Sequence, residues 1–227
     1  MGAQMTAIRI PSTTLRAVTA GLADPDRREM AVPSYTHWNP LIRWLFWDRL
    51  DVSVRLGDVQ PGEAVFEFAT GTGILLPTHH AVARRVACTD LHPGPAIAMA
   101  KLSGFPTEHV PLESLESWAS SNESKFDCIY AIDCLDHVSE KELDALVPLF
   151  GRLLGPRGRL IMCGPTESMW YKLGRLVAGF RNEYHHRTVF DVDRLLRTHF
   201  AREAWVGLPG SPLPRGFWIG RYVSASR

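Results

Sequence analysis

The chain has 227 residues, of which 45% are hydrophobic and 22% are charged. These are ordinary values for a globular protein, so they argue against a disordered chain, and the length fits one domain with short additions. The 25 Lys and Arg residues nearly balance the 24 Asp and Glu residues, for a net charge of +1. Because a dedicated nucleic-acid binder uses a basic surplus to hold phosphates, we expect no nucleic-acid partner.

The sequence shows no targeting or membrane-spanning signal. No run of about 18 apolar residues occurs, and the first residues have no continuous apolar core of signal-peptide length. The four cysteines, Cys88, Cys128, Cys134 and Cys163, form no C-x-x-C pair, which favours buried reduced thiols over a disulfide framework. We therefore expect a cytoplasmic protein with no integral membrane segment. Its oligomeric state is not predicted.

The chain opens with an N-terminal extension, residues 1–34, which mixes small, charged and proline residues without a long hydrophobic period. Asn39 and Pro40 then supply a helix N-cap and a residue suited to the first helical position. Apolar residues at helical spacing continue from there and predict an amphipathic helix over about 40–57. We place the main domain at 35–227.

From Ala64 onward, short apolar runs alternate with helical stretches. Ser139 and Glu142 form the sequence pattern of a capping box at the start of one helix. The alternation predicts right-handed βαβ crossovers, a parallel sheet, and a ligand at the carboxyl ends of the strands. We expect strands at about 64–68, 85–89, 108–111, 126–132 and 159–163, a turn at 155–158, helices at about 95–102, 139–154 and 191–199, and final strands near 202–206 and 217–223.

The most informative segment is the turn that follows the first expected strand. Gly71 and Gly73 form a Gly-x-Gly pattern there, which lets a ligand approach bare backbone near the amides of the next helix. A dinucleotide-binding fingerprint needs a third glycine where Leu76 stands, and no Gly-Lys-Ser/Thr of a P-loop follows. These departures weaken both nucleotide interpretations.

Two carboxylates flank this turn in the expected sheet. Glu67 lies just before the glycines, and Asp90 ends the second strand. Because neighbouring parallel strands end at the same edge, Asp90 can accept two hydrogen bonds from ribose hydroxyls while Glu67 faces a cationic ammonium group. A ligand with a ribose, no phosphates and a positively charged amino acid tail is S-adenosylmethionine.

The segment from Glu67 to Gly73 resembles motif I of the class I S-adenosylmethionine-dependent methyltransferases, E/D-x-G-x-G-x-G, with Ala69 at the first glycine. The resemblance is to small-molecule enzymes, similar to methyltransferase-domain types 11 and 25. Three further segments resemble the family's second-strand motif, its fourth-strand motif and the turn before its fifth strand. They are residues 89–93, 126–138 and 153–160, and all four motifs occur in family order.

The resemblance implies an α/β fold, a Rossmann-like doubly wound sheet of seven strands that is mostly parallel with an antiparallel last strand. It implies S-adenosylmethionine as cofactor, with Asp90 binding the ribose and Glu67 reaching the methionyl ammonium by way of water. The backbone near Ile132 and Asp133 is expected to face the methionyl end. The adenine-binding acid has no clean counterpart, and Glu113 is the nearest. The expected cofactor-binding residues are Glu67, Ala69, Thr70, Gly71, Gly73, Asp90, Leu91, Glu113, Ile132 and Asp133.

Two further regions are candidates for acceptor binding and catalysis. His137 follows the fourth strand, where a neutral imidazole can take a proton from a nucleophile, and tethering of the loop is the alternative. Family analogy makes the helix within 35–60 a lid, with Tyr35 and Trp38 facing the substrate. The alternatives are packing of this helix on the sheet and an interfacial helix that grips a greasy acceptor.

The segment 165–190 follows the fifth strand, and family analogy makes it a substrate-facing insertion. Tyr184, His185 and His186 lie in it, and they either contact the acceptor or lie on the surface. No third residue with metal-ligand spacing accompanies the two histidines, so we expect no metal site.

The main hypothesis is methyl transfer from S-adenosylmethionine to an O, N or C atom of a small-molecule acceptor. The sulfonium is already activated, so the protein mainly aligns the reactants and excludes water. The fourth strand runs into Asp133-Cys134-Leu135-Asp136, not the Asn/Asp-Pro-Pro-aromatic motif of many base and glutamine methyltransferases. One alternative is a protein of this fold that binds the cofactor for a non-methylating reaction such as cyclisation. The other is a nicotinamide-dependent oxidoreductase, against which Leu76 and the lack of a Tyr-x-x-x-Lys pair count.

Overall fold

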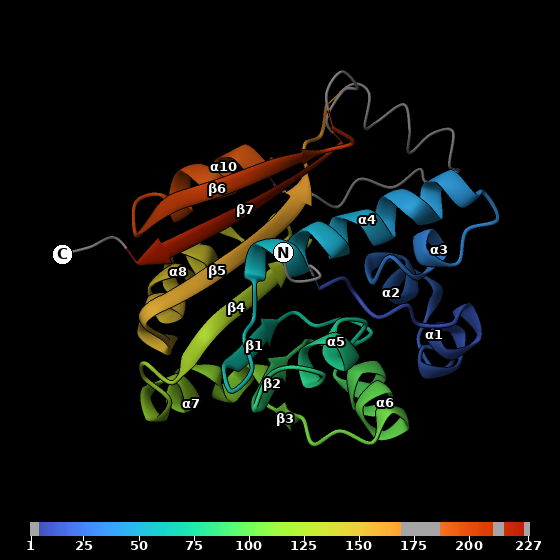
Figure 1. The fold of residues 1–227 in the computed structure, drawn as a ribbon, viewed down its shortest axis with the longest axis horizontal. Coiled ribbons are helices and arrows are strands. Elements are labelled where there is room, and N and C mark those ends of the chain that lie inside the picture. The colour runs from blue at the N-terminus through green and yellow to red at the C-terminus, as the bar shows by residue number, and fades with distance from the viewer. Residues whose placement is uncertain (1–4, 169–186, 211–215, 225–227) are drawn as a thin grey trace.

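A computed structural model describes residues 5–168, 187–210 and 216–224, and the account below concerns these residues. A seven-stranded sheet in the order β3-β2-β1-β4-β5-β7-β6 forms its centre (Figure 1). Strands β1 to β5 pair in parallel, and β7 runs antiparallel to both β5 and β6. The predicted Rossmann-like sheet is therefore confirmed. The strands are β1 (Ala64–Phe68), β2 (Arg85–Thr89), β3 (Glu108–His109), β4 (Phe126–Ile132), β5 (Leu154–Pro165), β6 (Phe200–Leu208) and β7 (Phe217–Ser224).

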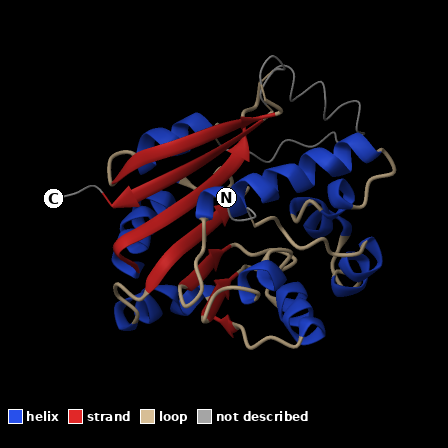
Figure 2. Cartoon of the chain, viewed as in Figure 1, coloured by secondary structure: helices blue, strands red, loops and turns tan. Residues whose placement is uncertain are grey.

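Helices cover both faces of this sheet (Figure 1 and Figure 2). One face carries α7 (Leu115–Ser121), α8 (Glu140–Leu153) and α10 (Val189–Leu196). The other carries α1 (Ser12–Val18), α2 (Asp24–Glu29), α3 (Val32–Tyr35), α4 (Pro40–Gly57), α5 (Leu76–His80) and α6 (Gly94–Ser103). A 3₁₀ turn, η1 (Leu112–Ser114), leads into α7.

Alternation along β1 separates the two hydrophobic cores. Phe66 and Phe68 pack with side chains of α7, α8 and α10, whereas Val65 packs with residues of α1, α3 and α4. Both faces of β1 are thus buried, as is usual for a central parallel strand. Because successive side chains of a strand point to opposite faces, Glu67 points to the same face as Val65. A buried carboxylate therefore lies on the side of the sheet that α4 covers.

The caps of α4 and α8 explain where these helices begin. The Asn39 side chain accepts a hydrogen bond from the Leu41 amide at 2.9 Å, and Pro40 takes the first helical position. Ser139 and Glu142 form the expected capping box at the start of α8. The predicted helices at about 40–57 and 139–154 are confirmed.

Several predicted boundaries differ from the structure, and three of the differences have a clear physical reason. The expected turn at 155–158 belongs to β5, where Leu154 pairs with Phe126 and Arg159 with Cys128. The extra residues bulge out of the pairing without ending the strand. Helix α10 begins at Val189, not at about 191, because Thr188 supplies a capping box. Strand β3 ends at His109, before Pro111, which lacks the amide that continued pairing needs.

The N-terminal extension packs against the rest of the molecule. The Asp51 carboxylate on α4 accepts hydrogen bonds from the Ala7 amide at 2.9 Å and from the Arg9 guanidinium, and the Thr78 hydroxyl on α5 accepts one from the Ile8 amide at 2.8 Å. Leu15 of α1 is fully buried. The helices of this extension contain four to seven residues, too few for a long hydrophobic period to show in the sequence.

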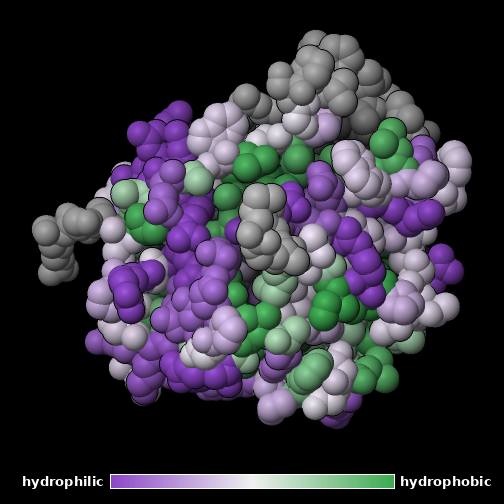
Figure 3. Space-filling view, viewed as in Figure 1, coloured by the Kyte–Doolittle hydropathy of each residue, from purple (hydrophilic) through white to green (hydrophobic). Residues whose placement is uncertain are grey.

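Hydrophobic side chains on the face drawn in Figure 3 form several separate patches, with hydrophilic side chains between them. No helix among the described residues is long and apolar enough to cross a membrane. The cysteines Cys88, Cys128, Cys134 and Cys163 are buried and free, as predicted, although Cys134 lies in the loop after β4 and not in a strand.

Candidate active site

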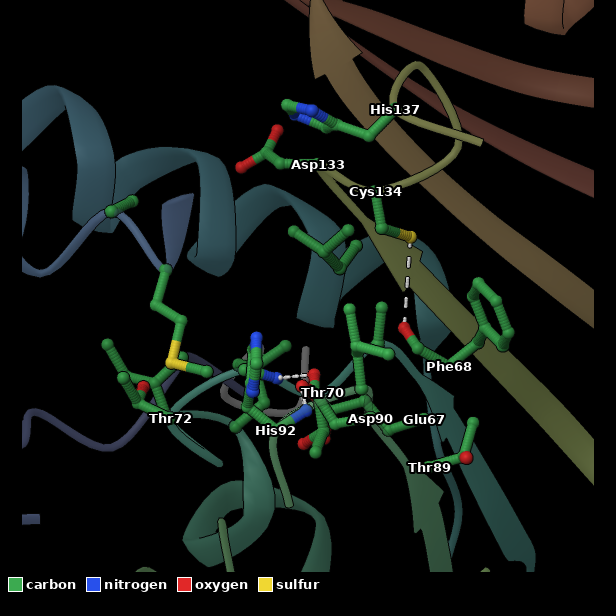
Figure 4. Close-up of a pocket in the computed structure, with 18 of the residues that line it drawn as sticks. Glu67, Phe68, Thr70, Thr72, Thr89, Asp90, His92, Asp133, Cys134 and His137 are labelled. Atoms are coloured by element: carbon green, nitrogen blue, oxygen red, sulfur yellow. Dashed lines mark hydrogen bonds between the residues drawn. The ribbon is translucent and has the colours of Figure 1, made fainter. Parts of the chain in front are cut away.

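A cavity of about 720 Å³ opens at the carboxyl ends of β1, β2 and β4. This volume lies within the usual range for small-molecule sites. Its walls come from the loops after these strands, from the segment around α2 and α3, and from α4 and the first half of α8. In Figure 4, Thr70, Asp90 and His92 lie at one end of the cavity, and Asp133 and His137 lie at the other.

The loop after β1 forms the floor of the cavity with an unusual backbone. Ala69, Gly71 and Gly73 have φ values of 53°, 57° and 71°, a region that L side chains rarely adopt. A Cβ atom added at Gly73 would lie 3.1 Å from the Cα atom of Ala96 on α6. Gly71 lines the cavity. Gly73 does not line it, and the absence of a side chain there lets α6 pack close to the loop.

Asp90 connects the end of β2 to this loop. Its Oδ2 accepts a hydrogen bond from the Gly71 amide at 2.7 Å, and its Oδ1 accepts one from the His92 amide at 2.8 Å. Burial raises the pKa of Asp90, and the two backbone hydrogen bonds oppose that rise. The backbone therefore fixes the carboxylate in one orientation at the cavity wall.

Glu67 lies deeper, at the end of β1. Its side chain is 95% buried, and its Oε2 has no hydrogen-bond partner. Burial raises the pKa of Glu67 to about 8, the nearby Thr70 hydroxyl opposes the rise, and the charge of Asp90 adds to it. At neutral pH the carboxyl group is therefore largely protonated in the free protein.

The other end of the cavity contains an ion pair. Asp133 follows β4 with a φ of 51°, its amide donates to the Cys163 carbonyl at 2.8 Å, and its carboxylate pairs with Arg49 of α4. The Arg49 guanidinium is buried, donates to the Tyr35 hydroxyl at 2.8 Å, and lies 4.3 Å from the centre of the Phe46 ring. This arrangement neutralises Asp133 and fixes it at the cavity wall.

His137 lies in the loop between β4 and α8. Its side chain is one-third exposed, and its Nε2 is 3.9 Å from Oδ2 of the buried Asp136. The His137 amide also donates to the Cys134 carbonyl at 3.1 Å. His137 thus lies at the cavity wall near a buried carboxylate, at a distance longer than a hydrogen bond.

The structure brings most of the predicted site residues together. The predicted residues that line the cavity are Tyr35, Glu67, Ala69, Thr70, Gly71, Asp90, Leu91, Ile132, Asp133 and His137. Gly73 and Glu113 do not line it, and Trp38 lies just before α4 with 82% of its surface exposed. Tyr184, His185 and His186 lie outside the described residues.

Sequence reasoning missed several residues of the cavity wall, among them Met30, Ala31 and Arg49. Arg49 carried a usable signal, because helical spacing places it with Phe46 on the buried stripe of α4, where a lone cation needs a partner. The irregular extension gave no such signal for Met30 and Ala31. Within the ranges that the structure describes, no three His, Cys, Asp or Glu residues form a group that could hold a metal ion.

Comparisons with known proteins agree with this geometry. A family model described as a methyltransferase domain matches residues 49–198. A curated relative, the ubiquinone biosynthesis O-methyltransferase of Psychrobacter cryohalolentis, is 25% identical over 130 residues, which cover 52% of this chain and 49% of the relative. The chain thus spans about half the length of the curated relative it matches.

Two solved structures share the fold. The N-methyltransferase NodS of Bradyrhizobium japonicum, in complex with S-adenosyl-L-homocysteine, has a TM-score of 0.67 and 16% identity, covering 94% of this chain and 99% of its own. The [4+2]-cyclase SpnF has a TM-score of 0.61 and 14% identity, covering 80% of this chain and 84% of its own. At such low identity these two likenesses establish the fold alone.

Proposed function

The chain belongs to the methyltransferase-domain family of class I S-adenosylmethionine-dependent enzymes, and we propose that it transfers a methyl group from S-adenosylmethionine to an O, N or C atom of a small-molecule acceptor. The observation that carries this proposal is the Asp90 carboxylate, which the amides of Gly71 and His92 hold at the cavity wall. The bound product in NodS and the name of the curated relative support the same chemistry.

The residues around the cavity fit this cofactor. Each Asp90 oxygen accepts one backbone hydrogen bond and keeps a second lone pair for a ribose hydroxyl. Glu67 borders the cavity and has a buried carboxyl oxygen without a partner, which suits a group that meets an ammonium. The Gly71 backbone, with no side chain, allows a close approach of the ligand. Asp90 would hold the ribose, Glu67 the ammonium and the loop between them the sulfonium that links these two parts of the cofactor.

The cofactor would supply a sulfonium methyl group, which is already an activated electrophile. The protein then has to orient the acceptor and exclude water. Met30, Ala31 and Tyr35 form part of the cavity wall and are placed to exclude solvent. His137, next to Asp136, is placed to accept the proton that an O–H or N–H nucleophile loses as its bond to the methyl carbon forms.

The test is calorimetric titration with S-adenosylhomocysteine and S-adenosylmethionine. We expect micromolar binding, which corresponds to about −8 kcal/mol. Asp90→Asn keeps the size of the side chain and removes its charge, and we expect it to weaken binding at least about tenfold, since hydrogen bonds to a charged group contribute roughly 1.5–3 kcal/mol. Asp144→Asn, on the exposed side of α8, is the matched control and should bind like the wild type.

Two results would contradict the proposal. Unchanged affinity in Asp90→Asn would show that the ribose site is elsewhere. If the wild type bound neither ligand, S-adenosylmethionine would be excluded as the cofactor. The acceptor atom is a separate question, because the curated relative is an O-methyltransferase and NodS is an N-methyltransferase. Formation of S-adenosylhomocysteine from S-adenosylmethionine in the presence of phenols or amines would identify the acceptor class.

The fold shared with the cyclase SpnF supports one alternative, a reaction in which the methyl group is not transferred. The fate of the methyl group distinguishes the two. With a radiolabelled methyl donor, a methyltransferase passes the label to the acceptor, whereas a cyclase converts its substrate with the label still on the cofactor.

A further inference from the structure

Three buried polar side chains meet beneath the glycine loop, on the α4 side of the sheet. They are Glu67 of β1, His79 of α5 and Tyr130 of β4, whose exposed fractions are 4%, 0% and 0%. Oε2 of Glu67 and both ring nitrogens of His79 have no hydrogen-bond partner in the structure, whereas the Tyr130 hydroxyl lies away from them, beside Gly57 at the end of α4 and next to Cys128. Because buried polar groups are normally paired, two such groups whose Nε2 and Oε2 atoms lie 3.7 Å apart indicate a function beyond packing.

The geometry connects this cluster to the cavity. Glu67 of β1 pairs in register with Tyr130 of β4 and with Cys88 of β2. The side chains of Glu67, Tyr130 and Cys88 therefore lie in one row across the sheet, on the same face. The His79 ring packs on the Tyr130 ring with 4.5 Å between their centres, and His79 Nε2 lies 3.7 Å from Glu67 Oε2. Since Glu67 also borders the cavity, it connects the cavity to the buried imidazole.

The surroundings disfavour charge on both members of the pair. Burial lowers the pKa of His79 to about 3, so its ring is neutral, and burial raises the pKa of Glu67 to about 8. Among the described residues, no Lys or Arg forms an ion pair with Glu67, and Arg49, which lines the same cavity, pairs with Asp133 instead. The titratable groups that act on Glu67 or His79 from neighbouring elements are Tyr35, His80, Cys88, Asp90, Tyr130 and Cys134.

We propose that His79 is a positioning residue for Glu67, and that binding of the cofactor's ammonium group is coupled to release of the Glu67 proton. In the free protein the neutral carboxyl group directs its proton toward His79 Nε2. When the ammonium binds, the O–H bond of Glu67 breaks, one proton leaves to solvent, and the carboxylate pairs with the ammonium. His79 stays neutral, because its Nε2 takes up the proton that Glu67 gives up and its Nδ1 loses the proton that reaches solvent. The Nε2–H then donates to the carboxylate, and one proton is released in total.

This inference rests on the proposed cofactor. Two nucleosides distinguish a failure of the inference from a failure of the proposed function. S-adenosylhomocysteine carries the ammonium group, whereas 5′-methylthioadenosine lacks the amino acid end and keeps the adenosine. Calorimetry at pH 7 in buffers of different ionisation enthalpy counts the protons that binding releases. We expect about one proton for S-adenosylhomocysteine, because a group with a pKa near 8 is about 90% protonated at pH 7, and none for 5′-methylthioadenosine.

Variants at His79 test its positioning role. His79→Phe keeps a ring against Tyr130 and removes both nitrogens, so the Glu67 carboxylate loses its hydrogen-bond donor. We expect affinity for S-adenosylhomocysteine to fall about tenfold, equivalent to a shift of one pKa unit in the acid, while affinity for 5′-methylthioadenosine is unchanged. His79→Gln puts an amide near the position of Nε2 and should restore most of the affinity. Nitrogen-15 spectra of the wild-type ring should show the Nδ1–H tautomer in the free protein and the Nε2–H tautomer in the complex.

Four results would contradict the inference or part of it. Binding of S-adenosylhomocysteine without proton release would overturn the inference, since Glu67 would already be ionised. Equal affinity of His79→Phe and wild type for S-adenosylhomocysteine would reduce His79 to packing. Loss of 5′-methylthioadenosine binding in both His79 variants would also make His79 a packing residue, because the whole site would then be disturbed. If the wild type binds neither nucleoside, the proposed function itself is wrong, and the inference with it.

Discussion

The ion pair between Arg49 and Asp133 combines two features that are costly alone. The Arg49 guanidinium is buried, and Asp133 adopts a left-handed backbone conformation that few non-glycine residues tolerate. The ion pair reduces the free energy that burying the Arg49 guanidinium costs and holds Asp133 in its left-handed conformation. The Tyr35 hydroxyl accepts a further hydrogen bond from Arg49. Because Arg49 comes from α4 and Asp133 from the end of β4, the pair joins the covering helix to the sheet beside the cavity.

Breaking this pair from one side is expected to destabilise the protein. Arg49→Met leaves the Asp133 carboxylate without its cation, and we expect the free energy of unfolding to fall by roughly 3 kcal/mol. The double variant Arg49→Met, Asp133→Asn removes both charges and should recover part of that loss, since Asn also tolerates a positive φ. Urea denaturation of the two single variants and the double variant measures the coupling. Additive effects would show that the pair contributes nothing to stability.

His137 gives a prediction for the chemical step. In His137→Gln the side chain can still form hydrogen bonds but cannot take up a proton, so we expect kcat to fall about 100-fold, the lower end of the range for general-base catalysis. Affinity for S-adenosylhomocysteine should stay within about twofold of the wild-type value, because the role proposed for His137 involves the acceptor and not the cofactor. Steady-state kinetics with an identified acceptor, together with calorimetry, separates the two effects. An unchanged kcat would assign His137 to tethering of the loop.

Among the elements, those with strong local signals were predictable. Helix α4 has an N-cap at Asn39 and a proline after it, and β1, β2 and β4 are apolar runs that end at Glu67-Phe68, Thr89-Asp90 and Ile132. The sequence alone therefore predicted that Glu67 and Asp90, the acids near the ends of the first two strands, lie at one edge of the sheet. Local patterns carry this information because helix caps and strand ends depend on neighbours in the chain.

The remaining elements depend on contacts that the sequence does not show. Helices α1 to α3 are too short for a hydrophobic period, and the segment before α1 is held by a distant partner, Asp51 of α4. The bulge in β5 depends on its pairing with β4. His79 meets Glu67 only because α5 turns back onto the sheet, a turn that no spacing in the segment predicts. Parts of the site formed by such packing could not be predicted from the sequence.

The start of α8 gives a prediction at the scale of an element. The Ser139 side chain satisfies the amide of Glu142, whose carboxylate accepts a hydrogen bond from the Ser139 amide. Ser139→Ala removes the cap, and we expect the free energy of unfolding to fall by about 1 kcal/mol. Ser139→Asp restores a good cap and is the control. Thermal denaturation measures both, and equal melting temperatures for wild type and Ser139→Ala would show that the box does not stabilise α8.

At the scale of the molecule, the order of the strands explains the position of the cavity. From β1 the chain proceeds outward through β2 and β3, then returns to β4 and proceeds the other way through β5. The direction reverses between β1 and β4, and open α/β sheets bind their ligands at such a point, outside the carboxyl ends of the strands. Glu67, one residue before the end of β1, and Asp133, which directly follows β4, both line the cavity. The topology therefore brings together Glu67, an acid held neutral by burial, and Asp133, an acid that pairs with Arg49.

The dependence of stability on pH follows from Glu67 and His79. Burial raises the pKa of Glu67 from an ordinary 4.5 to about 8, so between these values the folded state binds more protons than the unfolded state, and stability falls as the pH rises. Burial lowers the pKa of His79 from 6.5 to about 3, so between these values the unfolded state binds more protons, and stability rises with pH. The two slopes oppose each other between pH 4.5 and 6.5, and above pH 6.5 only that of Glu67 remains.

We therefore expect the free energy of unfolding to fall by about 1 kcal/mol per pH unit between pH 6.5 and 8, the slope for one proton. Glu67→Gln keeps the shape of a neutral carboxyl group and cannot ionise, so its slope in this window should be flatter by that amount. Urea denaturation of both proteins at pH 6.5, 7.25 and 8 measures the difference, and contributions from all other groups cancel in it. Parallel slopes would show that Glu67 is already ionised in the folded protein at pH 6.5. Only a carboxyl group that is still protonated in the folded state makes the free energy of unfolding fall as it releases its proton.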